Sequence, residues 1–571
     1  MVVPLLSAPA GRRLAGRMTA LTPIECLPVK FGGTAATGPV TLGQLNTLQW
    51  VTKGEAFFGI VEWYLDIPAG ASLDDVAQAM AVLLTRHESL RTLYPDGPEP
   101  VQQVLGSGEL VIDVYEVAGA VDTLETAREL AARLRGRPFD VRADLPVRMA
   151  LAVRDGVPEA AALAFSHVAA DFIAMTVVGR QFAELAADPA SRLAAGRTHQ
   201  PLDQAAAERS DRLRRRADNA VRHWAQRLAT APRCLYAAPY RAEYDEGPWT
   251  GWLRSPAAAL AVPHITERTG GTRSMVVLAA LLGLLSWRTG QRDCVAVSLA
   301  SNRFEPRLRD YVGTLAQDTL LSVDAGTDSF DELVRRTGTA TLRSAKHGYF
   351  DVYRMQEAVR EVCHQRGIEF ERDCAVNNLL VAPVNQTPTV LRPVAQVPEA
   401  LADTTLHWWK PPPGESLLRL DLVEVDGLFN FGLWTCDTGR IPRHEIEALL
   451  RGLEAVLVAA AGGDLDLRRL GGITGLAPIA RGPEWSIVDG SWVELPEVRR
   501  LLVEALRTTA AVSIEDGRLV GHLAATDSVR TPEQAHAACM AALPGRYTAI
   551  TPAWYVIRDG DTVLAQGDGR R

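Results

Sequence analysis

The sequence lacks the cysteine spacings that mark a structural metal site or a disulfide framework. Its seven cysteines, at positions 26, 234, 294, 363, 374, 436 and 539, are scattered, and no two of them form a C-x-x-C pair. An odd number of dispersed thiols argues against both kinds of site. We therefore expect no metal, and we expect the reduced thiols of a cytoplasmic protein.

Excess positive charge and long apolar runs are absent as well. The formal net charge is −8, and the densest basic run, residues 209–224, spaces its arginines as a solvated helix face does. We expect no nucleic-acid partner, because no basic stripe is present to neutralise phosphates. No run approaches about 18 apolar residues, so we expect no membrane partner either. The N-terminal apolar run is short and precedes its arginines, a poor signal peptide, and residues 1–35 are predicted to be a flexible leader.

Helix and strand patterns alternate along the 571 residues, of which 47% are hydrophobic and 22% charged. Residues 72–94 form a predicted helix that Ser72 and Asp75 begin as a capping box. Residues 146–168 predict two strands around a turn, the second of them buried, and 171–188 predict a helix. Residues 417–439 predict a strand pair with a turn at Asp426-Gly427. This alternation is typical of a mixed α/β (α+β) fold.

One short stretch combines a histidine and an aspartate in apolar surroundings. It is "SHVAADF", residues 166–172, with His167 at the end of the second buried strand and Asp171 at the start of the next helix. Histidine is suited to proton transfer because its pKa lies near neutral pH. Taken alone, a histidine at a strand end is more often a structural residue, and both interpretations stay open on the pattern itself.

Several motifs stand in the order found in one protein family. "VTLGQLNTLQW" (40–50), "RHESLRTLY" (86–94), "SHVAADF" (166–172), "YVGTLAQDTLLSV" (311–323) and "DLVEVDGLFNFGLWTCDTGRI" (421–441) together resemble the condensation domains of nonribosomal peptide synthetases. The resemblance covers roughly residues 36–465. It implies two chloramphenicol-acetyltransferase-like lobes, residues 36–205 and 206–465, arranged in a V with a central tunnel.

The last part of the chain resembles a different protein. Residues 466–483 are rich in glycine and proline and are predicted to be a linker. Residues 484–571 resemble the small α+β subdomain of adenylation enzymes, but Asp568 stands where those enzymes have a catalytic lysine. No Gly-rich phosphate loop is present. We expect that this domain does not adenylate a substrate and instead caps, docks or dimerises.

The resemblance assigns roles around the histidine motif. It implies that His167 is the catalytic residue and that Asp171 forms an organising salt bridge with Arg303, since a buried carboxylate needs such a partner. Ser166 stands where the family has a first histidine, and its hydroxyl is expected to hydrogen-bond locally. Phe172 replaces a family glycine and is expected to reshape the loop or narrow the tunnel.

Three further residues have both a functional and a structural interpretation. Asn377 either lines the tunnel or caps a strand. Trp408 is either a lid or binding platform, or a packing residue. His87 is predicted to be structural, in a helix whose neighbouring charged residues form local ion pairs: Arg86, Glu88 and Arg91.

Together these expectations describe a stand-alone condensation enzyme of natural-product biosynthesis. It would transfer an acyl or aminoacyl group from a thioester to an amine, or less often a hydroxyl, of a small-molecule or aminoacyl acceptor. No cofactor is expected to be bound permanently, because phosphopantetheine would arrive on an acyl or peptidyl carrier protein in trans. Two alternatives stay open: an inactive recruitment or scaffold protein, and an acyltransferase that uses acyl-CoA.

Overall fold

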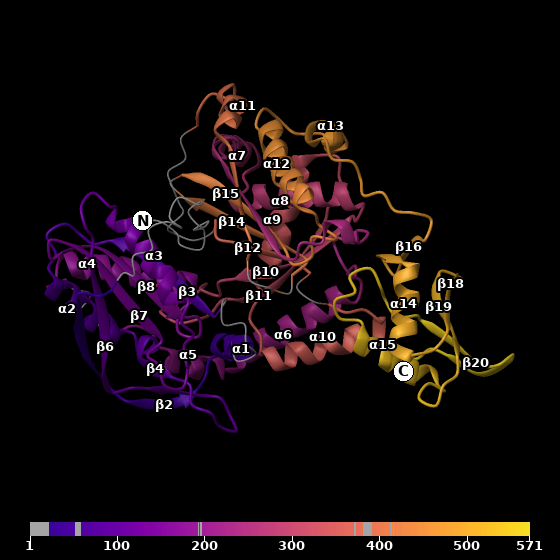
Figure 1. The fold of residues 1–571 in the computed structure, drawn as a ribbon, viewed down its shortest axis with the longest axis horizontal. Helices are drawn as coiled ribbons and strands as arrows, with labels where there is room; N and C mark the ends of the chain where they lie inside the picture. Colours follow the sequence, from indigo (N-terminus) through magenta and orange to yellow (C-terminus); the bar gives the residue numbers. More distant parts are fainter. Residues whose placement is uncertain are drawn as a thin grey trace. The chain divides into compact units, whose positions relative to one another are not determined.

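The computed structural model describes residues 22–570 except 52–58, 192, 194–196, 371–372, 381–390, 412–413, 415 and 426. The chain divides into two compact units (Figure 1). The first contains the chain up to Ala217 together with Ala300–Gln317 and Tyr349–Val352, and the second contains the remainder. The predicted lobe boundary at residue 205 lies inside helix α5 (Pro201–Glu208), and the segment with Arg303 belongs to the first unit.

The first unit is built on a five-stranded sheet in the order β1-β6-β7-β8-β3. Its strands are β1 (Glu25–Gly32), β3 (Ile60–Asp66), β6 (Ser107–Glu116), β7 (Val147–Arg154) and β8 (Val157–Ser166). All neighbours are antiparallel except β6 and β7, which are parallel. The predicted strand pair at 146–168 is confirmed as β7 and β8, joined by a turn at Asp155-Gly156 with positive φ at both residues.

Residues 25–32 correct the prediction of a flexible leader over residues 1–35. They form β1, which pairs with β6 from Glu25↔Val114 to Gly32↔Ser107. The alternating pattern of Val29 and Phe31, both buried, against exposed neighbours explains why this segment pairs as an edge strand. Residues 1–21 lie outside the described part.

Helices cover both faces of this sheet. α2 (Leu73–Arg86) and α4 (Phe172–Ala187) share one apolar core with it, and α3 (Thr123–Arg135) shares a second core. The capping box of Ser72 and Asp75 is confirmed at the start of α2. The remaining elements of this unit are α1 (Leu42–Val51), α5, a small sheet of β2 (Ala36–Pro39), β4 (Thr92–Leu93) and β5 (Val101–Val104), and the first part of α6 (Asp211–Leu228).

The predicted helix over 72–94 ends early, at Arg86, because His87 adopts an extended backbone. His87 is buried, and its Nε2 lies 2.7 Å from the side-chain oxygen of Gln181 on α4. Burial lowers the pKa of His87 to about 4. Arg91 is buried too and donates to the backbone carbonyls of Leu84 and Leu105, and within the described part of the chain it makes no ion pair with a neighbouring carboxylate. His87 is therefore structural, but through a contact with another helix.

The second unit contains a seven-stranded sheet in the order β11-β10-β12-β14-β15-β9-β13. The predicted strand pair at 417–439 is present as β14 and β15, although Asp426 of its turn lies outside the described residues. Helices pack on the sheet through one large core. The bounds are β9 (Trp249–Ser255), β10 (Asp293–Ala300), β11 (Gln317–Asp324), β12 (Cys374–Asn378), β13 (Thr405–Trp409), β14 (Leu418–Val425), β15 (Leu428–Thr435), α7 (Pro256–Thr269), α8 (Arg273–Thr289), α9 (Phe330–Ala345), α10 (Val352–Arg366), α11 (Gln396–Glu399) and α12 (Arg443–Ala460).

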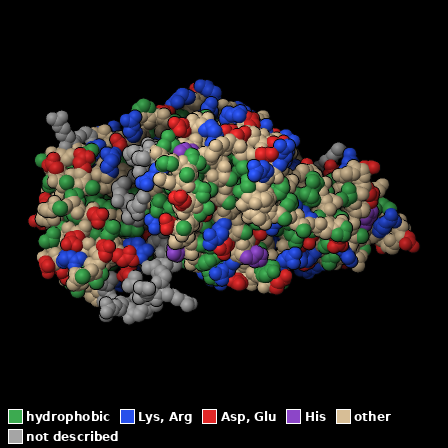
Figure 2. All heavy atoms as spheres, turned by 90° about the horizontal axis from the view of Figure 1, so that it is seen from above, with side chains coloured by type: hydrophobic (Ala, Val, Ile, Leu, Met, Phe, Trp, Pro, Cys, Tyr) green, Lys and Arg blue, Asp and Glu red, His purple; other side chains and the backbone are tan. Residues whose placement is uncertain are grey.

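α7 and α8 are apolar helices of the second unit. Within the described ranges, no single helix has the length and apolarity needed to cross a membrane, and α7 and α8 meet those limits only as a pair bent by 101°. Both of these helices contribute to the core of the second unit. On the face seen in Figure 2, basic and acidic side chains are interspersed.

The predicted linker at 466–483 is part of the second unit and packs into its core. Leu467, Leu470 and Leu476 are all buried in its core, and α13 (Leu470–Thr474) forms within the segment. Trp287 donates from its indole nitrogen to the carbonyl of Leu476 at 2.9 Å. Leucines at this spacing, among glycines, form a short packed helix instead of a free tether.

α10 lies beside the C-terminal domain (Figure 1), and the two share one apolar core. Cys363 and Ile368, from the end of α10 and the turn after it, lie in one apolar cluster with Leu501 and Tyr555. In the opposite direction, Tyr547 belongs to the core of the preceding sheet and helices. The domain's elements are β16 (Trp485–Val488), β17 (Ser491–Glu494), α14 (Leu495–Leu506), β18 (Ala510–Glu515), β19 (Arg518–Ala524), α15 (Pro532–Ala542), β20 (Trp554–Asp559) and β21 (Thr562–Gly567).

Because the core is shared, a substitution in the turn after α10 should destabilise the C-terminal domain, residues 484–571. Ile368 is 1% exposed, and Ile368→Ala should cost about 2–5 kcal/mol of unfolding free energy, since it leaves a cavity. Limited proteolysis should then cleave within residues 484–571 faster than in the wild type. The control Leu342→Ala, at a side chain 61% exposed, should leave the cleavage rate unchanged. Unchanged cleavage in Ile368→Ala would contradict a shared core.

Candidate active site

The histidine motif lies between the end of β8 and the start of α4. The backbone N–H of His167 donates to the carbonyl of Gly59 at 2.8 Å, and that of Ala169 donates to the carbonyl of Ser166 at 2.9 Å. Val168, Ala169 and Ala170 are fully buried. The full burial of these three residues agrees with the small and compact apolar side chains of the motif.

Asp171 has all of its acceptor capacity engaged within the first unit. Arg303 donates Nη1 to Oδ2 at 2.7 Å and Nη2 to Oδ1 at 2.8 Å. The backbone N–H groups of Leu315 and Ala316 donate to Oδ2 at 2.9 and 3.2 Å, and that of Ala174 donates to Oδ1 at 2.9 Å. The carboxylate therefore caps α4 and joins it to residues 303–316, in agreement with the ion pair that the resemblance implies.

Charge and burial act against each other at Asp171. Burial alone would raise the pKa of this carboxyl, which is 1% exposed. Arg303, in charge and hydrogen bonding, and the amides of Ala174 and Leu315 outweigh burial and hold the pKa below its ordinary value. The N-terminus of α4 adds to this stabilisation. Asp171 is thus a permanently charged anchor and does not exchange protons near neutral pH.

The two residues that depart from the family pattern behave differently. Phe172 is the first residue of α4 and packs against Trp63, with ring centroids 6.2 Å apart. Its backbone is not among the described positions with positive φ, so the left-handed freedom of glycine is not needed there. Ser166 is 1% exposed, and its Oγ contacts no hydrogen-bond partner in the described part of the chain, contrary to the local bond expected for it.

The ring of His167 is partly buried. Its Nδ1 is enclosed and has no hydrogen-bond partner on any other described residue. Since the side chain as a whole keeps some exposure, Nε2 is the nitrogen available to a substrate. Burial lowers the pKa of His167, while its own backbone carbonyl and Asp171 act in the opposite direction. The imidazole is therefore neutral at neutral pH, as a proton acceptor must be.

One aromatic neighbour of His167 was not predicted. The rings of Trp50 and His167 have centroids 5.4 Å apart and planes at 79°, an edge-type contact. Trp50 lies at the end of α1. It is the last residue of the motif at 40–50, to which the sequence assigns no individual functional residue. The contact joins residues more than a hundred positions apart, and no spacing pattern in the sequence predicts it.

A buried carboxylate in the first unit also escaped prediction. Glu208 is 8% exposed and accepts hydrogen bonds from the backbone N–H of Leu42 at 2.8 Å and from Gln204 at 3.1 Å. Burial raises its pKa to about 7, although Leu42, Gln204 and Tyr349 lower it in part. Glu208 therefore holds the first turn of α1, the helix that carries Trp50.

The remaining predicted site residues belong to the second unit. Asn377 lies on β12 and donates from its side-chain nitrogen to Asp421 at 2.8 Å. Trp408 lies on β13 with its ring centroid 6.4 Å from that of Trp249, and the guanidinium of Arg443 lies over both rings. Trp408 thus packs against Trp249 and Arg443, and the alternative role as a lid or binding platform stays a prediction.

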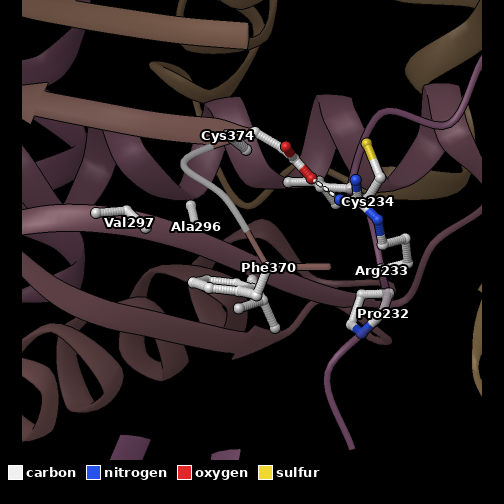
Figure 3. Close-up of a pocket in the computed structure, with 10 residues that line it drawn as sticks. Pro232, Arg233, Cys234, Ala296, Val297, Phe370 and Cys374 are labelled. Atoms are coloured by element: carbon white, nitrogen blue, oxygen red, sulfur yellow. Dashed lines mark hydrogen bonds and ion pairs between the residues drawn. The ribbon is translucent and has the colours of Figure 1, made fainter. Parts of the chain in front are cut away.

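A small cavity in the second unit has none of the features of a catalytic site (Figure 3). Its volume is about 10 Å³, far below that of a ligand pocket. The buried ion pair of Arg233 and Asp373 lines it together with Cys234 and Cys374. Burial raises the pKa of both thiols, so neither is a thiolate nucleophile. No three His, Cys, Asp or Glu residues of the described chain are placed to hold a metal ion.

Comparisons with known proteins agree with this fold. The model of the Condensation domain family matches residues 45–379. The AMB antimetabolite synthetase AmbB of Pseudomonas aeruginosa is 26% identical over 415 residues, which is 70% of this chain and 31% of AmbB. The chain thus spans less than a third of that relative.

Two solved structures are similar in fold. The SgcC5 protein from Streptomyces globisporus superposes with a TM-score of 0.57 at 21% identity, over 74% of this chain and 99% of SgcC5. The first condensation domain of the calcium-dependent antibiotic synthetase gives a TM-score of 0.55 at 16% identity, over 75% of this chain and 96% of that domain. The chloramphenicol-acetyltransferase-like α/β fold is therefore present.

Neutralising the anchor carboxylate should destabilise the first unit. Asp171→Asn leaves Arg303, whose side chain is 5% exposed, without its counter-charge, and we expect a loss of about 3–5 kcal/mol in chemical denaturation. The exposed pair of Arg180 and Asp310 provides the control, since Asp310→Asn should cost less than about 1 kcal/mol. Equal losses in the two variants would show that the buried pair is not an anchor.

Glu208 should make stability depend on pH. Its pKa is about 7 in the folded chain against an ordinary 4.5, so the folded state binds more protons between these values. Stability relative to Glu208→Gln should then fall as pH rises through this window, by about 3 kcal/mol at most, and level off above it. Denaturation at several pH values measures this difference. A flat difference would contradict it, and Glu267→Gln, at an exposed carboxyl, controls for the charge change.

Proposed function

The chain belongs to the Condensation domain family, whose model matches more than half of its 571 residues, and on that premise we propose an acyl-transfer function. The protein takes an acyl or aminoacyl group from the phosphopantetheine thioester of a carrier protein, supplied in trans, and passes it to an amine or hydroxyl acceptor. The relation to synthetases such as AmbB supports amide-bond formation in natural-product biosynthesis.

The observation that carries the proposal is the state of His167. A neutral imidazole with Nδ1 enclosed leaves Nε2 to accept a proton. In the proposed step the acceptor nitrogen or oxygen attacks the thioester carbon and its proton passes to Nε2. The carbon–sulfur bond then breaks, and the proton returns to the leaving thiolate. Bond formation and cleavage balance without an oxidant or a metal ion.

Asp171 supports this chemistry without taking part in proton transfer. Its oxygens are occupied by Arg303 and backbone amides, so the loop holding His167 keeps its position while the substrates change. Phe172 supports activity as well, since it occupies an ordinary helical position. The tunnel expected between the lobes stays a prediction.

The second candidate is an inactive recruitment protein, and the serine at position 166 favours it. A hydroxyl stands in place of the first family histidine, and it makes no hydrogen bond to the described residues. Such a protein would bind a partner enzyme without turnover. A third candidate, acyl transfer from acyl-CoA, differs from the first only in the donor.

The test is intact-mass detection of acyl transfer from a panel of carrier-bound donors to amine and alcohol acceptors. Alcohols belong in the panel because the fold neighbour SgcC5 forms a complex with an aromatic diol. Removal of the proton acceptor in His167→Ala should lower the rate by about 10²–10⁴-fold. The exposed His444 gives the matched control His444→Ala, which should leave the rate unchanged.

Three outcomes would overturn the proposal in different ways. Equal product from His167→Ala and the wild type would remove the catalytic role of His167. Transfer from acyl-CoA alone would replace the donor. Stable binding of a partner enzyme with no product from any donor would favour recruitment.

A further inference from the structure

Among the described residues, no other residue holds the His167 ring by a hydrogen bond. Nδ1 is buried without such a partner among the described residues, and both oxygens of Asp171 are filled by Arg303 and backbone amides. The backbone at His167 is anchored through Gly59, but this bond does not set the side-chain torsions. A base that must face its substrate needs some other contact to hold its ring.

Trp50 provides that contact. Its ring meets the imidazole with centroids 5.4 Å apart and planes at 79°, within the range that favours edge-to-face pairs. Both side chains are partly buried. An edge-to-face contact is directional, since tilting either ring loses it. It therefore restricts the rotation of the imidazole from outside residue 167, in addition to the interaction of the ring with its own backbone carbonyl.

The helix that carries Trp50 is itself held against the loop that binds Asp171. A Cβ on Gly43, in the first turn of α1, would lie 2.3 Å from the carbonyl oxygen of Thr314. The next residue, Leu315, donates its backbone N–H to Asp171. Glu208 accepts from the N–H of Leu42 in the same turn. The N-terminal end of α1 thus contacts the anchor of the histidine loop, and its C-terminal end contacts the histidine.

We propose that Trp50 is the positioning residue of His167, holding the imidazole so that Nε2 faces the acceptor. The role rests on the proposed acyl transfer, but the ring contact itself does not depend on turnover. Loop and ring are then held separately: Asp171 and Arg303 hold the loop, and α1 and Trp50 hold the ring.

Because Trp50 covers the ring of His167, the pKa of His167 provides a measurement that does not depend on activity. Removing the indole opens the ring to water and relieves the burial that lowers its pKa. The pKa of His167 should then rise toward its ordinary value. Asp171 is the one charged side chain that acts on this ring in the described structure, and the substitution leaves it in place.

The experiment is an NMR pH titration of the full chain with ¹³C-labelled histidine, with the His167 signal assigned from its loss in His167→Gln. In Trp50→Ala the signal should lose the ring-current shift of the indole, and its pKa should move up by about 0.5 or more. Trp50→Phe, which keeps a smaller aromatic ring, should fall between Trp50→Ala and the wild type. Trp485→Ala, on β16, should change neither quantity.

Kinetics distinguish positioning from substrate binding. If Trp50 positions the base, Trp50→Ala should lower kcat by about tenfold or more with little change in the acceptor KM. A change in KM alone, with the His167 titration unaltered, would overturn the proposal and make Trp50 a substrate contact. Circular dichroism and the unfolding midpoint of each variant exclude misfolding as the cause. If the wild type transfers no acyl group, the proposed function fails, while the titration still decides the ring contact.

Discussion

The ion pair between Asp171 and Arg303 is the interaction on which the arrangement of the first unit depends. Removing two charges from water is costly, and the attraction between them repays this cost only with good geometry and additional hydrogen bonds. On the arginine, Nε is buried without a partner among the described residues, so the additional bonds are mainly those of the carboxylate. Here the carboxylate receives two guanidinium bonds and three backbone N–H groups. These bonds connect the helix after the histidine motif to Ala300–Gln317, which is distant in sequence but belongs to the same unit.

This ion pair fixes the backbone at Asp171 without a hydrogen bond to the imidazole of His167. Were Asp171 to accept a bond from His167, it would raise the basicity of the ring and share in its proton transfers. Because Arg303 and backbone amides fill its oxygens, Asp171 acts on His167 only through its charge, and the lowered pKa of His167 reflects mainly burial. The charged groups thus give mechanical support, and the neutral imidazole beside an indole is left for the proton transfer that we propose.

The sequence predicts local features well and contacts across the fold poorly. The capping box of Ser72, the hairpin of β7 and β8 and the start of α4 follow from nearby residues, and the pairing of Asp171 with Arg303 followed from the family resemblance. The strand at Glu25–Gly32 was missed because its partner residues are 75 to 89 positions away in the sequence. Trp50 and Glu208 were missed for the same reason, since only the folded chain shows that one meets an imidazole and the other is buried.

The mutual packing of α10 and the C-terminal domain limits how this protein could be recombined. Val359 and Phe370 pack against the cluster that Leu501 and Tyr555 form, and Tyr547 packs in the other direction. A chimera cut at residue 484 would divide one apolar cluster between two parents. An exchange of the C-terminal domain therefore has to include α10 and the turn after it. More than a hundred residues of sequence separate these segments from the domain.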